Sequence, residues 1–205
     1  MPPAALLPAP NVRRIGRRWR VPRPTCVETK EQRKESWELP SADSHKPLLL
    51  VDIDGVISLF GGDLSAQVGS FHSIEGIAHF LSATAAAHLL ALIEHFEPVW
   101  CSGWEEKADE HLPHLLGPPA GIPFLRFDRS VGRTNAHWKL DAIDAYAGTR
   151  ALAWIDDALS APCHRWADAR RAPTLLVQTD PATGLTARET ERLLGWAACI
   201  RSLPQ

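Results

Sequence analysis

Two carboxylates stand at the end of an apolar run. The stretch LLLVDIDGV, residues 48–56, leads four apolar residues directly into Asp52 and Asp54, which one isoleucine separates. Two unit charges about 4 Å apart repel each other by about 4 kcal/mol at an effective dielectric constant near 20, and removal from water adds to that cost. A strand that ends in this way therefore needs a compensating group. A divalent cation with oxygen ligands is sufficient, and Mg²⁺ is the usual choice.

Further polar groups follow other apolar runs along the chain. Ser102 and Gly103 come after the run PVWC, and the pair Asp156-Asp157 comes after ALAWI. Lys139 lies one turn into the helical pattern that precedes ALAWI. Ligands of open parallel sheets bind beyond the carboxyl ends of the strands, so we expect these groups to converge on one edge of a sheet.

Together these groups are suited to phosphoryl transfer. A cation held between Asp52 and Asp156 would neutralise the charge of a bound phosphate while it is transferred. Ser102, Lys139 and nearby backbone N–H groups would bind the phosphate oxygens. The predicted ligand is therefore a phosphorylated substrate, whose identity the sequence leaves open.

The elements that must position these groups alternate between short apolar runs and helical periodicity. Strands are expected at residues 48–53, 98–101, 124–127, 151–155 and 174–178, and helices at residues 84–95, 105–116, 136–147 and 187–200. A short polar segment is expected between the last two strands. Such alternation predicts an α/β fold with a central parallel sheet that helices cover on both faces.

Capping residues support several of these helix boundaries. Thr186 begins a capping box before the last helix, Asn135 can cap the helix that carries Lys139, and Gly148 can end that helix. Ser102, with a glutamate three residues later, also has the capping-box pattern. Ser102 is therefore expected to begin a helix, to contact phosphate, or to do both.

The motif order resembles the haloacid dehalogenase (HAD) superfamily. DIDGV, Ser102 at a strand end, Lys139 and IDD follow one another as the four motifs of that superfamily do, within residues 47–205. The resemblance implies a Rossmannoid three-layer fold and a phosphatase (hydrolase) activity. It implies that Asp52 is the nucleophile, which forms an aspartyl-phosphate, and that Asp54 protonates the leaving oxygen and then activates water.

The resemblance also implies which residues bind phosphate and metal. Phosphate would be bound by Ser102, Gly103 and Lys139. Mg²⁺ would be bound by Asp52, Asp156 and the Asp54 carbonyl. Asp157 is expected to stand behind the ligands rather than among them.

Asp54 favours phosphatase chemistry within the superfamily. Dehalogenating members lack this second aspartate, and the transport ATPases follow their nucleophile with Lys-Thr-Gly-Thr. A plainer interpretation of Asp54-Gly55 is a type I′ turn between two apolar runs, because Asp-Gly is a strong hairpin signal.

A short insert is expected after the first strand. Once a helix and a strand are allowed for before Ser102, residues 58–83 remain, enough for a flap hairpin and a small helical element. The chain therefore resembles minimally capped members, whose open sites often accept macromolecular substrates such as phosphoproteins or nucleic-acid ends. The segment VWCSGWEEKADEHLPHLLG is also similar to a HAD domain of bacterial proteins associated with RNA repair.

The first 45 residues differ in composition from the rest. Residues 1–45 are predicted to be a disordered Pro/Arg-rich tail in front of a hydrolase domain at residues 46–205. Residues 13–34 contain nine Lys or Arg against two Glu, although the whole chain has a formal net charge of -2. This segment is interpreted either as a solvated tail or as an arm that binds nucleic acid.

Composition excludes several other classes. The chain's four cysteines form no CxxC pair, and no apolar run approaches the length of a membrane span, which favours a cytoplasmic protein that does not enter membranes.

The predicted function is a Mg²⁺-dependent phosphomonoester hydrolase. The alternatives are a polynucleotide end phosphatase in RNA repair and a weakly active nucleic-acid-binding protein that uses the tail.

Two other side chains near the expected site have open roles. Trp104, beside the phosphate loop, either packs or stacks on a ring of the substrate. Asp180, beyond the last strand, either lines the site or shapes its own loop.

Overall fold

The computed structural model describes residues 46–127 and 136–202. The predicted tail at residues 1–45 and the predicted cap at Asn135 lie outside the described residues. All statements below concern the described part of the unit that begins at Pro40.

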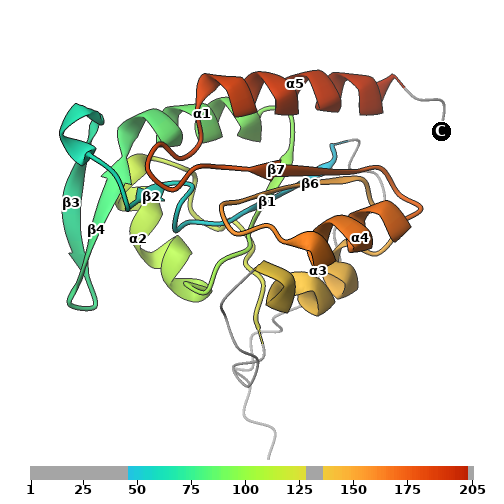
Figure 1. Cartoon of the computed structure of the whole chain (residues 1–205), viewed down its shortest axis with the longest axis horizontal. Helices are drawn as coiled ribbons and strands as arrows, with labels where there is room; N and C mark the ends of the chain where they lie inside the picture. The colour runs from blue at the N-terminus through green and yellow to red at the C-terminus, as the bar shows by residue number, and fades with distance from the viewer. Residues whose placement is uncertain (1–45, 128–135, 203–205) are drawn as a thin grey trace, which may run out of the picture. The chain divides into compact units, whose positions relative to one another are not determined.

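A four-stranded parallel sheet forms the centre of this unit, in the order β5-β1-β6-β7 (Figure 1). The strands are β1 (Leu48–Val51), β5 (Glu97–Trp100), β6 (Leu152–Asp156) and β7 (Thr174–Gln178). Val51 pairs with Trp100 on one side and with Ile155 on the other. Because the strands are parallel and in this register, the residues that follow β1, β5 and β6 emerge side by side, as the sequence predicts.

Helices cover both faces of the sheet (Figure 1). The helices are α1 (Ala83–Ile93), α2 (Glu106–Leu116), α3 (Leu140–Ala147), α4 (Ala161–Ala169) and α5 (Ala187–Arg201). In Figure 1, α1 and α5 lie above the sheet, and α3 and α4 lie below it. The expected three-layer α/β fold is confirmed.

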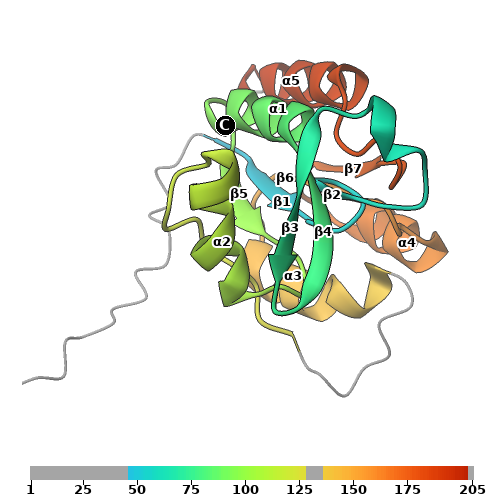
Figure 2. The ribbon, with the colours of Figure 1, turned by 90° about the vertical axis from the view of Figure 1, so that its left-hand side faces the viewer.

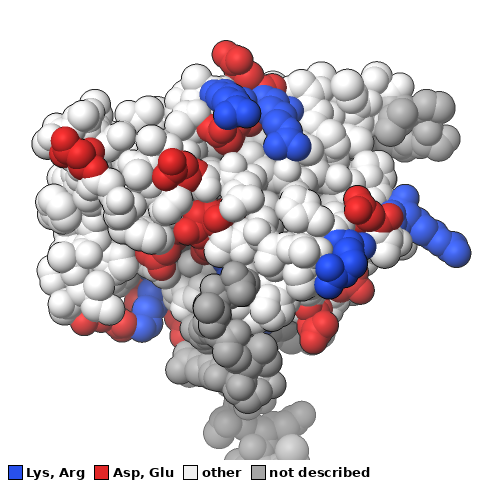
Figure 3. All heavy atoms as spheres, in the orientation of Figure 1, with Lys and Arg blue, Asp and Glu red and all other residues white. Residues whose placement is uncertain are grey.

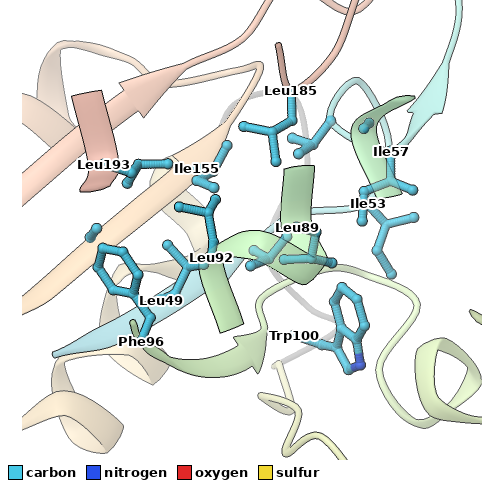
Figure 4. Packing of buried hydrophobic residues seen from close by; sticks show 14 of the residues in the cluster. Leu49, Ile53, Ile57, Leu89, Leu92, Phe96, Trp100, Ile155, Leu185 and Leu193 are labelled. Carbon is cyan, nitrogen blue, oxygen red and sulfur yellow. The ribbon is translucent and has the colours of Figure 1, made fainter. Parts of the chain in front are cut away.

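Side chains of β1 alternate between two hydrophobic clusters. Leu49 and Val51 belong to the cluster that includes residues of α1, α2 and α5, whereas Leu48 and Leu50 belong to the cluster that includes residues of α3 and α4. Successive side chains of a strand point to opposite faces of its sheet, so a strand buried on both faces must be apolar throughout. Figure 4 shows the first cluster, in which Leu193 lies near the side chains of the sheet.

A small antiparallel insert follows β1, as expected. It contains β2 (Ser58–Leu59), the 3₁₀ helix η1 (Leu64–Ala66), β3 (Gly69–Ile74) and β4 (Ile77–Ser82), with strand order β2-β4-β3. Figures 1 and 2 show it beside the edge at which the parallel strands end. Its two ends meet, because Ser82 N–H donates to the Ile57 carbonyl at 3.0 Å. From Ser82 the chain enters α1, and the Ser82 hydroxyl accepts from Ala85 N–H.

One expected strand is not formed, one helix was not expected, and one expected helix begins with a different helical turn. Residues 124–127 form no strand, because the chain makes one bridge, Trp100 to Phe124, and then the Phe127 N–H turns to the Glu105 carboxylate. The expected polar segment after β6 contains α4, whose Pro162 stands in the first turn, where a helix tolerates it. The expected helix at 136–147 begins with a 3₁₀ turn, η2 (Ala136–Lys139), before α3.

Two expected caps are confirmed. Thr186 and Glu189 form the capping box of α5, and Gly148 ends α3 with φ of 51°. Both lie at helix ends where local sequence alone satisfies the free backbone groups.

Candidate active site

The loop after β1 is held tightly at Asp52 and Gly55. Asp52 is 7% exposed, and its Oδ1 accepts a hydrogen bond of 2.8 Å from Ile53 N–H. Gly55 has φ of 73°, and a Cβ there would lie 2.4 Å from Cγ of Asp157. The Gly55 carbonyl accepts a hydrogen bond of 2.9 Å from the Thr179 hydroxyl beyond β7. Glycine is therefore required here both by the backbone conformation and by the lack of space.

Lys139 joins the ends of two strands. Its Nζ lies 2.8 Å from Oδ2 of Asp52 and 2.7 Å from Oδ2 of Asp156, and its side chain is 3% exposed. Burial alone would lower the pKa of Lys139, but the two carboxylates raise it above its ordinary value. Lys139 is therefore a fixed positive charge between the two aspartates, directly before the first turn of α3.

Three carboxylates gather around this ammonium. One oxygen each of Asp52, Asp156 and Asp157 lies within 4.8 Å of the others. Burial and repulsion from Asp52 raise the pKa of Asp156 to about 6, against the lowering effect of Lys139. One ammonium cannot neutralise three carboxylates, so the cluster keeps an excess of negative charge when it is ionised.

This donor set fits a hard divalent cation. Carboxylate oxygens are the ligands that Mg²⁺ and similar ions prefer. Asp157, expected behind the ligands, is close enough in this geometry to offer an oxygen itself. The carboxylates of Asp52, Asp156 and Asp157 could therefore hold a metal ion.

The predicted site residues surround one cavity of about 330 Å³. Its lining comes from the loops after β1, β5 and β6 and from η2: Asp52, Asp54, Ser102, Gly103, Trp104, Ala136, Trp138, Lys139, Asp156, Asp157 and Ala158. Every residue predicted to bind metal or phosphate is therefore brought together at this edge of the sheet. The cavity is large enough for a phosphoryl group and part of its leaving group.

Ser102 does not cap α2, contrary to the expected capping box. The cap position is Glu105, with φ of 49° and no side-chain capping bond, and Ser102 contributes its backbone carbonyl to Glu105 N–H at 3.1 Å. Ser102 is buried and lines the cavity. Its hydroxyl is therefore not engaged at the start of the helix.

Asp54 is held by side chains from two other elements. Trp104 Nε1 donates a hydrogen bond of 3.0 Å to Asp54 Oδ2, and His79 Nδ1 lies 3.6 Å from Asp54 Oδ1. Partial burial raises the pKa of Asp54, despite the opposing hydrogen bond from Trp104. Asp54 also bridges to Ser58 through the backbone, so the carboxylate sits where the loop turns into the insert.

Sequence reasoning missed His79 and left Trp104 between two roles. His79 lies on β4, 25 positions from Asp54 in sequence, and no motif spacing connects the two residues. Trp104 packs edge-to-face against the His79 ring, with centroids 4.7 Å apart. Trp104 therefore packs, which is one of the two roles expected for it. Its hydrogen bond to Asp54 was not predicted from the sequence.

Asp180 shapes its own loop. It is exposed, and its Oδ1 accepts a hydrogen bond of 2.9 Å from Ala182 N–H. It does not line the cavity that contains Asp52. The interpretation of Asp180 as a lining residue is therefore wrong.

Surface charge around the site is unevenly distributed. On the face seen in Figure 3, Lys and Arg side chains gather mainly over α5 at the top and near α4 at the right, whereas acidic side chains lie across the left and centre. The basic segment at residues 13–34 lies outside the described residues.

No helix within residues 46–127 and 136–202 is both long and apolar enough to cross a membrane.

Comparison with known proteins gives one family. The family model described as "HAD domain in Swiss Army Knife RNA repair proteins" matches residues 48–190, which is more than half of the chain. The match includes β1, the insert, the four motif positions and the start of α5. No curated protein matches the chain.

Proposed function

The chain belongs to the family of HAD domains found in Swiss Army Knife RNA repair proteins, and from this premise we propose that it is a Mg²⁺-dependent phosphomonoester hydrolase acting through Asp52. The observation that carries the proposal is the contact of Lys139 Nζ with both Asp52 and Asp156 inside the cavity. A buried ammonium between two carboxylates offers a fixed positive charge to the oxygens of a phosphoryl group that reaches Asp52.

In this proposal Asp52 and Asp54 divide the chemistry. An Asp52 oxygen bonds to phosphorus as the bond to the leaving oxygen breaks, and the Asp54 proton moves to that oxygen. A water then attacks the phosphorus, returns a proton to Asp54 and releases Asp52 as inorganic phosphate leaves. Ser102, Gly103 and Lys139 bind the phosphoryl oxygens during both steps.

Three residues of this chain would hold the metal through their side chains. Asp52, Asp156 and Asp157 offer carboxylate oxygens close to one another, and the Asp54 carbonyl is proposed as a further oxygen ligand. Bound there, Mg²⁺ would neutralise charge on the phosphoryl group. The excess of carboxylate over ammonium charge supports this assignment.

For the substrate we propose a phosphorylated end of RNA. Support comes from the family description, which names RNA repair proteins, and from the short insert, which leaves the site without a large cap. The basic segment at residues 13–34 would supply the salt-dependent part of the binding. The cavity itself requires only a phosphate monoester, so activated aryl phosphates should also react.

The test is phosphate release from 4-nitrophenyl phosphate, nucleotides, phosphopeptides and RNA with a 5′- or 3′-phosphate, with Mg²⁺ or with EDTA. We expect turnover in Mg²⁺, its loss in EDTA, and a fall of kcat by about 10⁴-fold or more in Asp52→Asn, because the residues of such a site act as a unit.

The matched control is Asp168→Asn, which makes the same chemical change at an exposed position on α4. It should retain full activity. Absence of phosphate release from every substrate by folded, Mg²⁺-loaded protein would overturn the hydrolase proposal. RNA binding that persists in that protein and disappears on deletion of residues 1–45 would then identify a nucleic-acid-binding protein.

A further inference from the structure

Two side chains hold the carboxylate of Asp54 from outside its own loop. Trp104 comes from the segment after β5, and its Nε1 lies 3.0 Å from Asp54 Oδ2. His79 comes from β4 of the insert, and its Nδ1 lies 3.6 Å from Asp54 Oδ1. The two oxygens of one carboxylate therefore face different partners.

The chemistry of these partners makes the two oxygens unequal. An indole N–H can only donate, so Asp54 Oδ2 accepts and is favoured as the carbonyl oxygen of the protonated acid. Rotation of the carboxyl group by half a turn would place its hydroxyl oxygen, a weaker acceptor, against the Trp104 N–H, so the indole also favours one orientation.

His79 is itself held in place. Its Nδ1 lies 3.0 Å from the Ser58 hydroxyl, its ring packs edge-to-face on Trp104 at 68°, and its side chain is 15% exposed. The pairing of β2 with β4 places Phe80 opposite Leu59, which fixes the position of its neighbour His79 along the strand. The imidazole, the indole and the carboxylate thus form a connected group between the insert and the catalytic loop.

We propose that Trp104 and His79 are positioning residues, which hold the Asp54 carboxyl group in one orientation at the cavity for proton transfer to the leaving oxygen. This inference rests on the proposed function, in which Asp54 is the proton donor. It assigns the insert a part in the chemical step through His79. Neither residue itself needs to touch the substrate.

The experiment compares two substrates of similar shape in Trp104→Phe. The leaving group of phenyl phosphate needs a proton, whereas that of 2,4-dinitrophenyl phosphate is stable as an anion. We expect kcat/KM for phenyl phosphate to fall by about tenfold or more, and kcat/KM for 2,4-dinitrophenyl phosphate to fall by less than about threefold. The ratio of the two values does not depend on the fraction of folded enzyme.

Two matched controls separate positioning from general damage. Trp166→Phe removes an indole N–H that donates to the carboxylate of Asp144, outside the site, and should leave the ratio unchanged. His79→Gln should change the ratio in the same direction as Trp104→Phe. His72→Gln should not, although His72 pairs directly opposite His79 on β3.

The outcomes are distinct. A selective loss on phenyl phosphate in both site variants supports the inference. Equal losses on both substrates, or no loss, overturn it while leaving the hydrolase proposal intact. A folded, Mg²⁺-loaded wild-type protein that releases phosphate neither from these two substrates nor from the nucleotides, phosphopeptides and phosphorylated RNA overturns the proposed function itself, and the inference with it.

Discussion

The carboxyl edge of the parallel sheet and the antiparallel insert are built in opposite ways. At the sheet edge, the buried strand β1 leads directly into Asp52, the buried strand β6 ends in Asp156, and the Lys139 side chain between these aspartates is 3% exposed. The insert displays large apolar side chains to solvent, since Phe71 and Ile77 are 66% and 62% exposed. At the sheet edge, charged side chains are held in place because the strands that carry them are buried. The insert instead contributes to the site through one side chain, His79, which contacts Asp54.

The largest effect expected from this contrast concerns ion pairs. Lys139→Met should leave Asp52 and Asp156 buried without their cation and lower the free energy of unfolding by about 3–5 kcal/mol in EDTA. Lys107→Met removes an exposed ion pair that links α2 to Glu75 in the turn of the insert, and should cost about 0–1 kcal/mol. Urea unfolding measures both. Equal losses of unfolding free energy in the two variants would contradict the expectation that the buried ion pairs of Lys139 stabilise the protein more than the exposed pair of Lys107 does.

Two glycines with positive φ allow a finer comparison. Gly55→Ala should lower the free energy of unfolding by about 2 kcal/mol or more, because an added Cβ meets Asp157 in addition to the cost of a left-handed backbone. Gly76→Ala, in the turn of the insert, has open space around it and should cost about 1 kcal/mol. Thermal unfolding of both variants tests this order. A larger effect at Gly76 would contradict it.

The smallest effect belongs to the outer surface of the insert. Ile77→Thr should change the free energy of unfolding by less than about 0.5 kcal/mol, because the side chain is already in solvent and threonine suits a strand. Leu92→Ala, at a buried position of α1, should cost about 2–5 kcal/mol by the same urea measurement. A loss at Ile77 close to that at Leu92 would mean that the insert buries this residue in solution.

The same contrast explains what the sequence could predict. The strand LLLV and the residues after β1, β5 and β6 were predictable because a doubly buried strand is a continuous apolar run, and because parallel strands end together. The α5 capping box was predictable because its donors and acceptors are three residues apart. Features that depend on residues within one helix or strand can therefore be predicted from the sequence.

Features that depend on contacts between elements were not predictable. Ser102 matches the capping-box pattern, yet the positive φ of Glu105 moves the start of α2 and leaves the serine hydroxyl at the cavity. The helix α4 is short, has Pro162 in its first turn and has Cys163 as its buried residue, so its contact with the core left little periodicity in the sequence. His79 reaches Asp54 only because the insert folds back over the loop.

The meeting of the two ends of the insert has an evolutionary consequence. Because Ser82 N–H bonds to the Ile57 carbonyl, the insert ends beside the point at which it begins, and the chain then enters α1. Lengthening such a closed excursion costs little, since closure entropy grows only slowly with loop length. During evolution a larger insert could therefore replace this one without disturbing the sheet. The replacement would have to supply its own partner for Asp54 in place of His79.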